Sequence, residues 1–153
     1  MRLEDIPLVG ALEQMLFPID AWPLELFYDE FSLVETRAYS VAEIDGHLVG
    51  YCGVMVVGEI ADIQTIGVLP EHEGKGIGTA MLTGMLEEAR RRGAAETLLE
   101  VREDNPRARS LYERFGFEHI HTRRGYYRDG VNAHVMRLVL ETGAAHEPSG
   151  DES

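Results

Sequence analysis

A glycine-rich loop carries the clearest chemical signal in the sequence. Gly74, Gly76 and Gly78 alternate with Lys75 and Ile77 just before a helical pattern. Glycine lets main-chain N–H groups approach an anion, and a helix start adds a positive dipole end, so the loop is typical of phosphate binding. The Walker and dinucleotide spacings both fail here. The alternative is a loop that merely turns the chain, although three alternating glycines exceed what a turn needs.

A glutamate inside an apolar strand pattern is the second signal. Glu100 lies between Leu99 and Val101, where burying a carboxylate is unfavourable without a purpose. The alternative is a carboxylate on the sheet face paired with an arginine such as Arg102. Tyr112 lies on a following helix face and is either a proton donor or a core residue. A carboxylate and a phenol together can serve as base and acid.

Three strands and two helices are expected before the loop. Asp5 is predicted to cap a first helix, and a second helix follows the prolines that interrupt the apolar pattern. Residues 37–44 alternate as a strand, and the Asp45-Gly46 pair predicts a two-residue hairpin. Residues 47–58 and 59–68 complete an antiparallel meander.

The second half of the chain alternates helices and strands. The loop opens a helix whose apolar stripe comprises Ile77, Met81, Leu82, Met85, Leu86 and Ala89. Gly93 is its expected end, and residues 97–101 form a strand, which implies a parallel crossover. Asn105 is predicted to cap another helix, which stops at Gly116. Strands at 117–122 and 132–140 follow, joined by a turn at 123–130. The sequence predicts one α/β domain over residues 1–141 and a disordered acidic tail over 142–153.

Composition narrows the class of protein. The 153 residues fit one domain that buries about two-thirds of its unfolded surface. No run of ~18 apolar residues occurs and no signal peptide is recognisable, so neither membrane insertion nor export is expected. Cys52 is the only cysteine, which excludes an internal disulfide and a cysteine zinc cluster. We expect a cytoplasmic protein that binds no metal.

The net charge of −13 argues against binding to nucleic acid. The charge is uneven along the chain. Residues 1–74 hold 14 acids and two bases, a balance of −12, whereas residues 75–141 hold 12 bases and 10 acids, a balance of +2. Residues 142–153 add three acids. An uneven solvated surface is the simplest explanation.

The loop and the strand before it resemble a known family. Ile66-Gly67-Val68-x-Pro70, then the glycine loop through Thr79 and its helix, is similar to the central motif of the GNAT superfamily of acyl-CoA-dependent N-acyltransferases. The resemblance covers residues 1–141. It implies a mixed, mostly antiparallel sheet of about six to seven strands with a central parallel pair and about four helices.

The same resemblance implies acetyl-CoA as the acetyl donor. Loop amides would hold its pyrophosphate, the strand before the loop would pair with the pantetheine arm, and the Val68 N–H would polarise the thioester carbonyl. Glu73 departs from the family pattern, which has Gln or Arg at that position. The residues expected to bind the coenzyme are Ile66, Gly67, Val68, Gly74, Lys75, Gly76, Ile77, Gly78, Thr79 and Asn105.

One branch of the family fits best. Asn105 and Tyr112 follow Glu100 by five and twelve positions, as in the bacterial ribosomal-protein-alanine N-acetyltransferases of the RimI type. That resemblance implies that Glu100 is the general base, that Tyr112 is the general acid for the leaving thiolate, and that Asn105 contacts the coenzyme. Trp22, Tyr126 and Tyr127 would line the acceptor groove; the alternative for one of the tyrosines is a hairpin packed on the sheet.

The resemblance therefore implies acetyl transfer to the N-terminal α-amine of a basic ribosomal protein. The negative charge of residues 1–74 would steer such a partner. An acetyltransferase for lysine side chains or small amines is the alternative within the same fold. A non-catalytic acyl-CoA sensor or partner subunit is the alternative outside enzymes, and the presence of both Glu100 and Tyr112 disfavours it.

Overall fold

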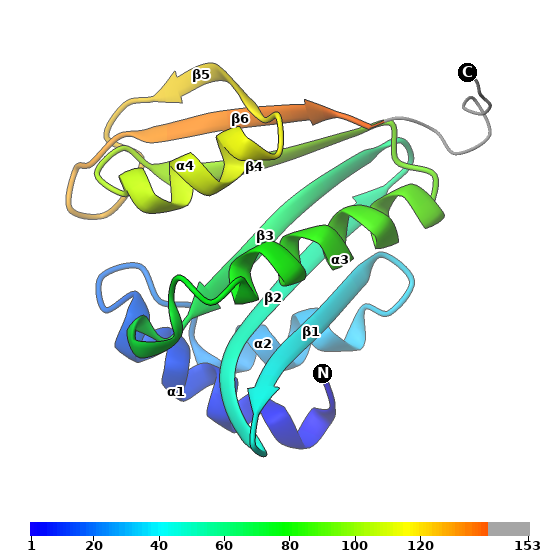
Figure 1. Ribbon diagram of the computed structural model, residues 1–153, viewed down its shortest axis with the longest axis vertical. Coiled ribbons are helices and arrows are strands. Elements are labelled where there is room, and N and C mark those ends of the chain that lie inside the picture. Colours follow the sequence, from blue (N-terminus) through cyan, green and yellow to red (C-terminus); the bar gives the residue numbers. More distant parts are fainter. Residues whose placement is uncertain (141–153) are drawn as a thin grey trace.

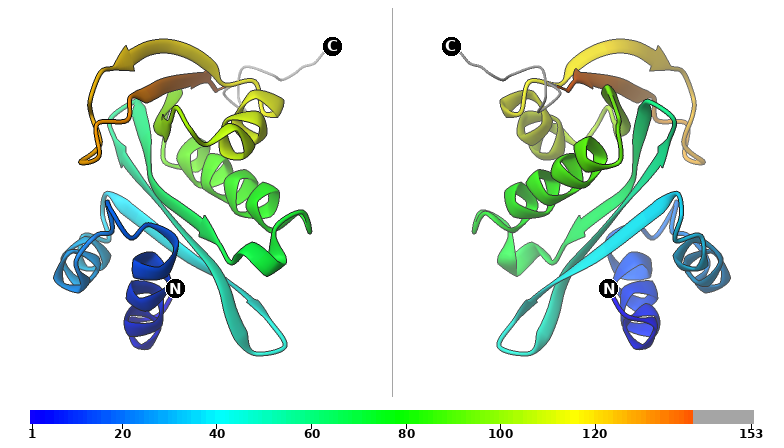
Figure 2. Two further views of the ribbon diagram at one scale, coloured as in Figure 1. Left: turned by 90° about the vertical axis from the view of Figure 1, so that its left-hand side faces the viewer. Right: turned by 90° about the vertical axis from the view of Figure 1, so that its right-hand side faces the viewer.

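The computed structural model describes residues 1–140, which form a six-stranded sheet with two helices on each face (Figures 1 and 2). The helices are α1 (Ile6–Leu16), α2 (Leu24–Ser32), α3 (Ile77–Arg91) and α4 (Pro106–Arg114). The strands are β1 (Arg37–Ile44), β2 (His47–Val57), β3 (Ile60–Val68), β4 (Glu96–Arg102), β5 (Glu118–Arg123) and β6 (Ala133–Val139). Their order across the sheet is β1-β2-β3-β4-β6-β5. The predicted α/β class and the counts of strands and helices are confirmed.

Two apolar cores lie on the two faces of the sheet. The larger joins α3 and α4 to one face, and five of the six residues of the predicted α3 stripe, from Met81 to Ala89, are buried in it. The smaller joins α1 and α2 to the other face around Tyr51, which is 0% exposed. Figure 2 shows the sheet between these helix pairs.

The first three strands form the expected meander. Asp45 and Gly46 both have positive φ, 53° and 80°, as a two-residue hairpin of type I′ requires. β2 pairs with β1 and β3 along its length, with a register shift between Gly53 and Val54 on the β3 side. The predicted strands therefore lie within about two residues of the observed ones.

The parallel pair β3–β4 is short. Only Ile60, Ala61 and Asp62 pair with β4, at its first three residues. Beyond them β3 stays paired with β2, and β4 stays paired with β6. The two strands therefore part toward their C-terminal ends, and they leave exposed main-chain groups where the glycine loop begins.

Helix ends follow the predicted signals, with one exception. The Asn105 side chain accepts a hydrogen bond from the Ala108 N–H at 3.2 Å, which confirms it as the cap of α4. Gly93 has φ +94° and donates its N–H to Arg90, so it ends α3 as expected. The predicted side-chain cap by Asp5 is wrong: its carboxylate turns back and accepts from the Arg2 N–H at 2.8 Å.

No helix within residues 1–140 is long and apolar enough to cross a membrane. The predicted tail at 142–153 lies outside the described residues, so its disorder stays a prediction.

Candidate active site

A cavity of about 560 Å³ opens where β3 and β4 part. Its walls come from the end of α1, the end of β3, the glycine loop and α4. The lining residues are Leu16, Phe17, Ile66, Gly67, Val68, Pro70, His72, Glu73, Gly74, Gly76, Gly78, Thr79, Asn105, Arg107, Ala108, Leu111, Tyr112 and Arg114. Eight of the ten residues expected to bind the coenzyme are among them.

The glycine loop presents main chain to this cavity. Gly74 and Gly76 have φ of +81° and +82°, in the left-handed region that glycine adopts without strain. A Cβ at either position would meet nothing within 4 Å, so the space beside the loop is open. Gly76 is also the N-cap of α3 and has no side chain to satisfy the first N–H groups of the helix. These N–H groups form a site suited to a phosphate.

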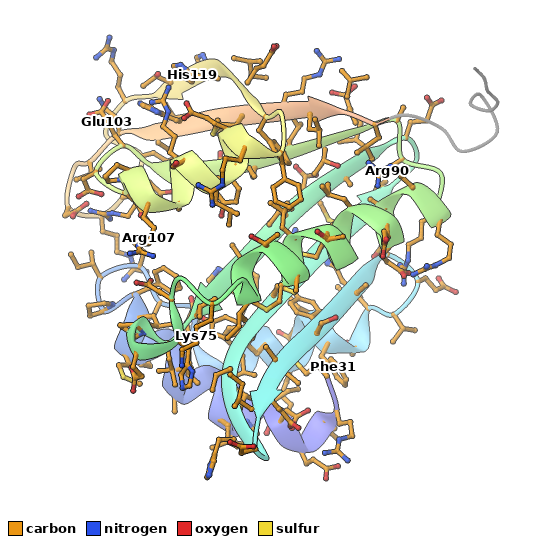
Figure 3. All side chains as sticks on the ribbon, in the orientation of Figure 1. Phe31, Lys75, Arg90, Glu103, Arg107 and His119 are labelled. Carbon is orange, nitrogen blue, oxygen red and sulfur yellow. The ribbon has the colours of Figure 1, made fainter. Side chains whose placement is uncertain are left out.

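Two of the expected coenzyme residues do not line the cavity. The Lys75 ammonium lies 3.3 Å from Nδ1 of His72, on the exposed side of the loop (Figure 3). Ile77 packs against the larger core. The expectation that these two side chains line the coenzyme cavity is therefore not met, although Lys75 lies beside His72, which does line it.

The edge of β3 faces the same opening. The N–H of Leu69 donates to the carbonyl of Val49 on β2 at 2.9 Å. Because N–H groups alternate in direction along a strand, the N–H of Val68 points the other way, toward the side of β4. β4 has already diverged at this level. The Val68 N–H is thus free of the strand pairing on that side.

Tyr112 projects from α4 into the cavity wall. Its side chain is 5% exposed, and its ring packs edge-on against Phe117 with centroids 5.9 Å apart. Burial raises the pKa of the Tyr112 phenol above its usual value. The hydroxyl therefore stays protonated at neutral pH, as a proton donor requires. Tyr112 is both a core residue and a cavity residue.

Glu100 lies on the opposite face of the sheet. Leu99 and Val101 are buried under α3 and α4, so the alternation of β4 turns Glu100 the other way. Its carboxylate pairs with Arg123 at 2.9 Å, not with Arg102. Burial, and then the charge of Glu100, raise the pKa of Asp62 on β3, so these two carboxylates face the same side.

Arg102 instead joins two distant loops. Its guanidinium pairs with Asp20 at 2.9 Å and with Asp129 at 2.6 Å, and it also binds the neighbouring Asp104. Asp20 precedes α2, and Asp129 lies in the turn between β5 and β6. The Arg128 N–H also donates to Asp20 at 3.3 Å. The α1–α2 connection is thereby fastened to the turn that carries the two tyrosines.

The aromatic residues expected in the acceptor groove lie on these two segments. Tyr126 and Tyr127 are 5.1 Å apart edge-to-face, and they lie beside Arg123 and Arg102 at 5.4 and 5.0 Å. Burial and the charge of Glu100 raise the pKa of Tyr127 to about 12. Tyr126 is 48% exposed.

Trp22 lies in the α1–α2 connection. Its ring packs against Phe27 of α2, with centroids 5.1 Å apart, at the edge of the smaller core. The structure thus connects the segment of Trp22 to the turn that carries Tyr126 and Tyr127 through the contacts of Asp20. The indole ring itself packs against Phe27 of α2.

Several cavity residues were missed in the sequence. Arg107 and Arg114, seven positions apart on α4, and His72 all line it. Arg107 lies 3.6 Å from Glu73, so the unexpected carboxylate of the loop has a cation beside it. The position of Arg107, two residues after the Asn105 cap, was the available signal. Within residues 1–140, no cluster of His, Cys, Asp and Glu has the form of a metal site.

A model of the Acetyltransferase (GNAT) family matches residues 9–117, more than half of the chain. The chain belongs to the GNAT family of acetyltransferases. As a GNAT protein it is an N-acetyltransferase, and its relatives support the narrower branch.

Three of those relatives are informative. A Bacillus subtilis protein, named provisionally as a [ribosomal protein bS18]-alanine N-acetyltransferase, is 37% identical over 92% of this chain and 93% of its own. The N-alpha-acetyltransferase RimI of Mycobacterium tuberculosis is 39% identical over 84% of this chain and 82% of its own. The crystal structure of the ribosomal-protein-S18-alanine N-acetyltransferase from Escherichia coli superposes with a TM-score of 0.84 and 28% identity, and covers 99% of this chain and 96% of that one.

Proposed function

We propose that this enzyme transfers the acetyl group of acetyl-CoA directly to the N-terminal α-amine of a protein, with the N-terminal alanine of a ribosomal protein as acceptor. The proposal rests on one arrangement at the place where β3 and β4 diverge. The cavity of about 560 Å³ opens there on one face of the sheet, and the Glu100 carboxylate lies on the other face. The relatives from Bacillus subtilis and Escherichia coli are named for such an alanine.

The cavity fits the donor. The open main chain at Gly74 and Gly76 suits the pyrophosphate, and the free edge of β3 suits the extended pantetheine arm. Asn105 and Arg107 face the same space from α4. Bound in this way, acetyl-CoA supplies an activated acetyl carbonyl at the level of Val68.

Two groups on the cavity side act on the donor. The Val68 N–H donates to the carbonyl oxygen, whose negative charge grows as the amine attacks. The Tyr112 hydroxyl donates its proton to the sulfur as the C–S bond breaks. The buried phenol holds that proton until the thiolate forms.

Glu100 acts from the other face. It accepts the proton of the α-ammonium through a water molecule, and the freed amine forms the C–N bond. An α-ammonium has a pKa near ~8, so a carboxylate base suffices near neutral pH, whereas a lysine side chain near ~10.4 demands a stronger base. This difference favours the α-amine.

Matched peptides test the proposal. One peptide carries a free N-terminal alanine and an internal lysine, and its partner differs only in a blocked α-amine. We expect acetyl-CoA to yield one acetyl group on the first peptide, located by mass fragmentation at residue 1, and none on the second. Acetylation of the blocked peptide on lysine would instead support the lysine acetyltransferase, and acetylation of neither would leave no support for a peptide acceptor.

A further inference from the structure

A buried carboxylate that the proposed chemistry does not use lies on α1. Glu13 is 3% exposed, and both of its oxygens accept hydrogen bonds. The Trp22 N–H donates to Oε2 at 3.0 Å, and the Tyr51 hydroxyl donates to Oε1. Burial raises the pKa of Glu13. A buried acid on an otherwise apolar helix face is unfavourable unless its hydrogen bonds have a structural purpose.

The hydrogen bond from the Trp22 N–H holds the α1–α2 connection, which is the segment proposed to lie on the acceptor side. Trp22 lies in the connection between α1 and α2, and its own ring and that of Tyr51 both pack on Phe27, at 5.1 and 6.2 Å. Glu13 connects Trp22 to Tyr51, because it accepts from the main-chain N–H of Trp22 and from the hydroxyl of Tyr51. The α1–α2 connection is thereby tied to β2.

The other hydrogen bond leads to the donor side. Tyr51 pairs with Gly67 across β2 and β3. A Cβ at Gly67 would lie 3.0 Å from Cε1 and Cζ of the Tyr51 ring, so the ring lies directly against the main chain of β3. Gly67 adjoins the Val68 N–H.

We propose that Glu13 is a positioning residue that holds the Trp22 segment in register with the donor-binding edge of β3. Trp22, Glu13, Tyr51 and Gly67 form a continuous series of contacts from the acceptor segment to the strand beside the thioester. The expected effect on the KM for the acceptor rests on the proposed function. The expected effect on the environment of Trp22 rests on the geometry alone.

Glu13→Gln tests the kinetic consequence. Glutamine has one carbonyl oxygen and one NH2 group in place of the two carboxylate oxygens, so either the Trp22 N–H or the Tyr51 hydroxyl loses the oxygen that accepts from it, and neither faces a charged group any longer. We expect KM for the acceptor peptide to rise about tenfold, the effect of one lost hydrogen bond to a charged group. We expect kcat and KM for acetyl-CoA to stay within about twofold, because neither the cavity nor the catalytic pair is touched.

Glu30→Gln is the matched control. Glu30 is another buried glutamate of the same helix pair, but it bonds to Arg37 and Tyr39, away from the Trp22 segment. Its replacement also changes a buried carboxylate that accepts from a tyrosine hydroxyl, and it removes the negative charge from the partner of Arg37. We expect its acceptor KM to equal that of the wild type. An equal rise in both variants would reduce the effect to general destabilisation and overturn the proposal.

The single tryptophan gives a readout that does not depend on catalysis. Trp22 is the only tryptophan of the chain, so its fluorescence reports this segment directly. We expect Glu13→Gln to increase acrylamide quenching of Trp22 and to shift its emission to the red, and Glu30→Gln to change neither. Unchanged quenching in Glu13→Gln would overturn the proposal, even if peptides are acetylated.

Hydrogen exchange covers the case in which Glu13→Gln does not fold. In the wild-type protein the Trp22 amide should exchange slowly, because the buried Glu13 carboxylate accepts its hydrogen. Rapid exchange of this amide would overturn the proposal without any variant. If no peptide is acetylated, the proposed function fails while the fluorescence and exchange results still decide on Glu13. If peptides are acetylated but the Glu13→Gln acceptor KM is normal, the inference alone fails.

Discussion

Replacing Tyr112 with phenylalanine removes one hydroxyl group from the cavity wall. The ring is 5% exposed and packs on Phe117, and phenylalanine fills the same space, so the wall and the affinity for acetyl-CoA should persist. Only the proton for the leaving thiolate is lost. General acid catalysis contributes about 10²–10⁴ in rate, or about 3–5 kcal/mol of transition-state stabilisation. We therefore expect kcat to fall by about that factor.

The assay follows the release of the coenzyme thiol with a saturating acceptor peptide, and binding of acetyl-CoA is measured separately by calorimetry. Tyr39→Phe is the matched control, because the Tyr39 hydroxyl bonds to Glu30 at 3.0 Å and lies outside the cavity lining. A Tyr112→Phe enzyme that keeps kcat within about threefold would refute the acid assignment. A parallel loss of acetyl-CoA affinity would instead assign the hydroxyl to binding.

The burial of Tyr112 also sets a pH limit. A general acid works while protonated, and burial raises the pKa of this phenol above ~10, so the wild-type kcat should not decline on its account below that pH. An alkaline decline near pH 8–9 that disappears from the residual rate of Tyr112→Phe would contradict this argument.

Glu100→Gln should remove the acidic limb of the pH–rate profile and lower kcat by about 10²-fold, and an unaltered profile would eliminate Glu100 as the base. Glu73→Gln should tighten acetyl-CoA binding about two- to fivefold and Arg107→Met should weaken it similarly, because the first removes an anion and the second a cation from the cavity; calorimetry checks both. Arg37 holds the pKa of Glu30 below its usual value, so this pair stabilises the fold above pH ~4.3 and is lost as the pH falls further. Thermal melts should accordingly show a smaller loss of Tm between pH 6 and pH 3.5 in Glu30→Gln than in the wild type. The acceptor KM of a basic peptide should rise with salt, and a salt-independent KM would count against electrostatic steering.

Local rules predicted the elements because each is marked by signals within a few residues. The apolar stripe of α3, the Asp45-Gly46 turn and the Asn105 cap all depend on neighbours in sequence, and all three are confirmed. Asp5 shows where such rules fail. Its spacing suits a cap, but an adjoining short helix at Leu3–Asp5 offers the Arg2 N–H, and the carboxylate turns to it.

The site depends on contacts that no local rule can assign. Arg102 lies two positions after Glu100 and on the same face of β4, yet Glu100 pairs with Arg123, and Arg102 pairs with Asp20, 82 positions away. The sheet decides this, because β5 returns beside β6 and carries Arg123 back toward β4. The roles of Glu13 and Arg107 likewise depend on where three or more elements meet. The residue types were visible in the sequence, and their partners were not.

The uneven charge along the sequence also has a counterpart in the arrangement of the strands in the sheet. In the sheet order β1-β2-β3-β4-β6-β5, the first three strands come from residues 1–74 and the last three from the rest of the chain. Within the sheet the two parts of the chain therefore meet at the seam between β3 and β4 where the cavity opens (Figure 1), although α3, from the second part, packs on β1, β2 and β3. Of the cations on the second side, Arg107, which lies 3.6 Å from Glu73, and Arg114 line the cavity, whereas Arg102 and Arg123 lie outside its lining and pair with carboxylates there. An anionic coenzyme is thus favoured on the α4 side of the seam, and a cationic chain end is favoured along α1 and α2.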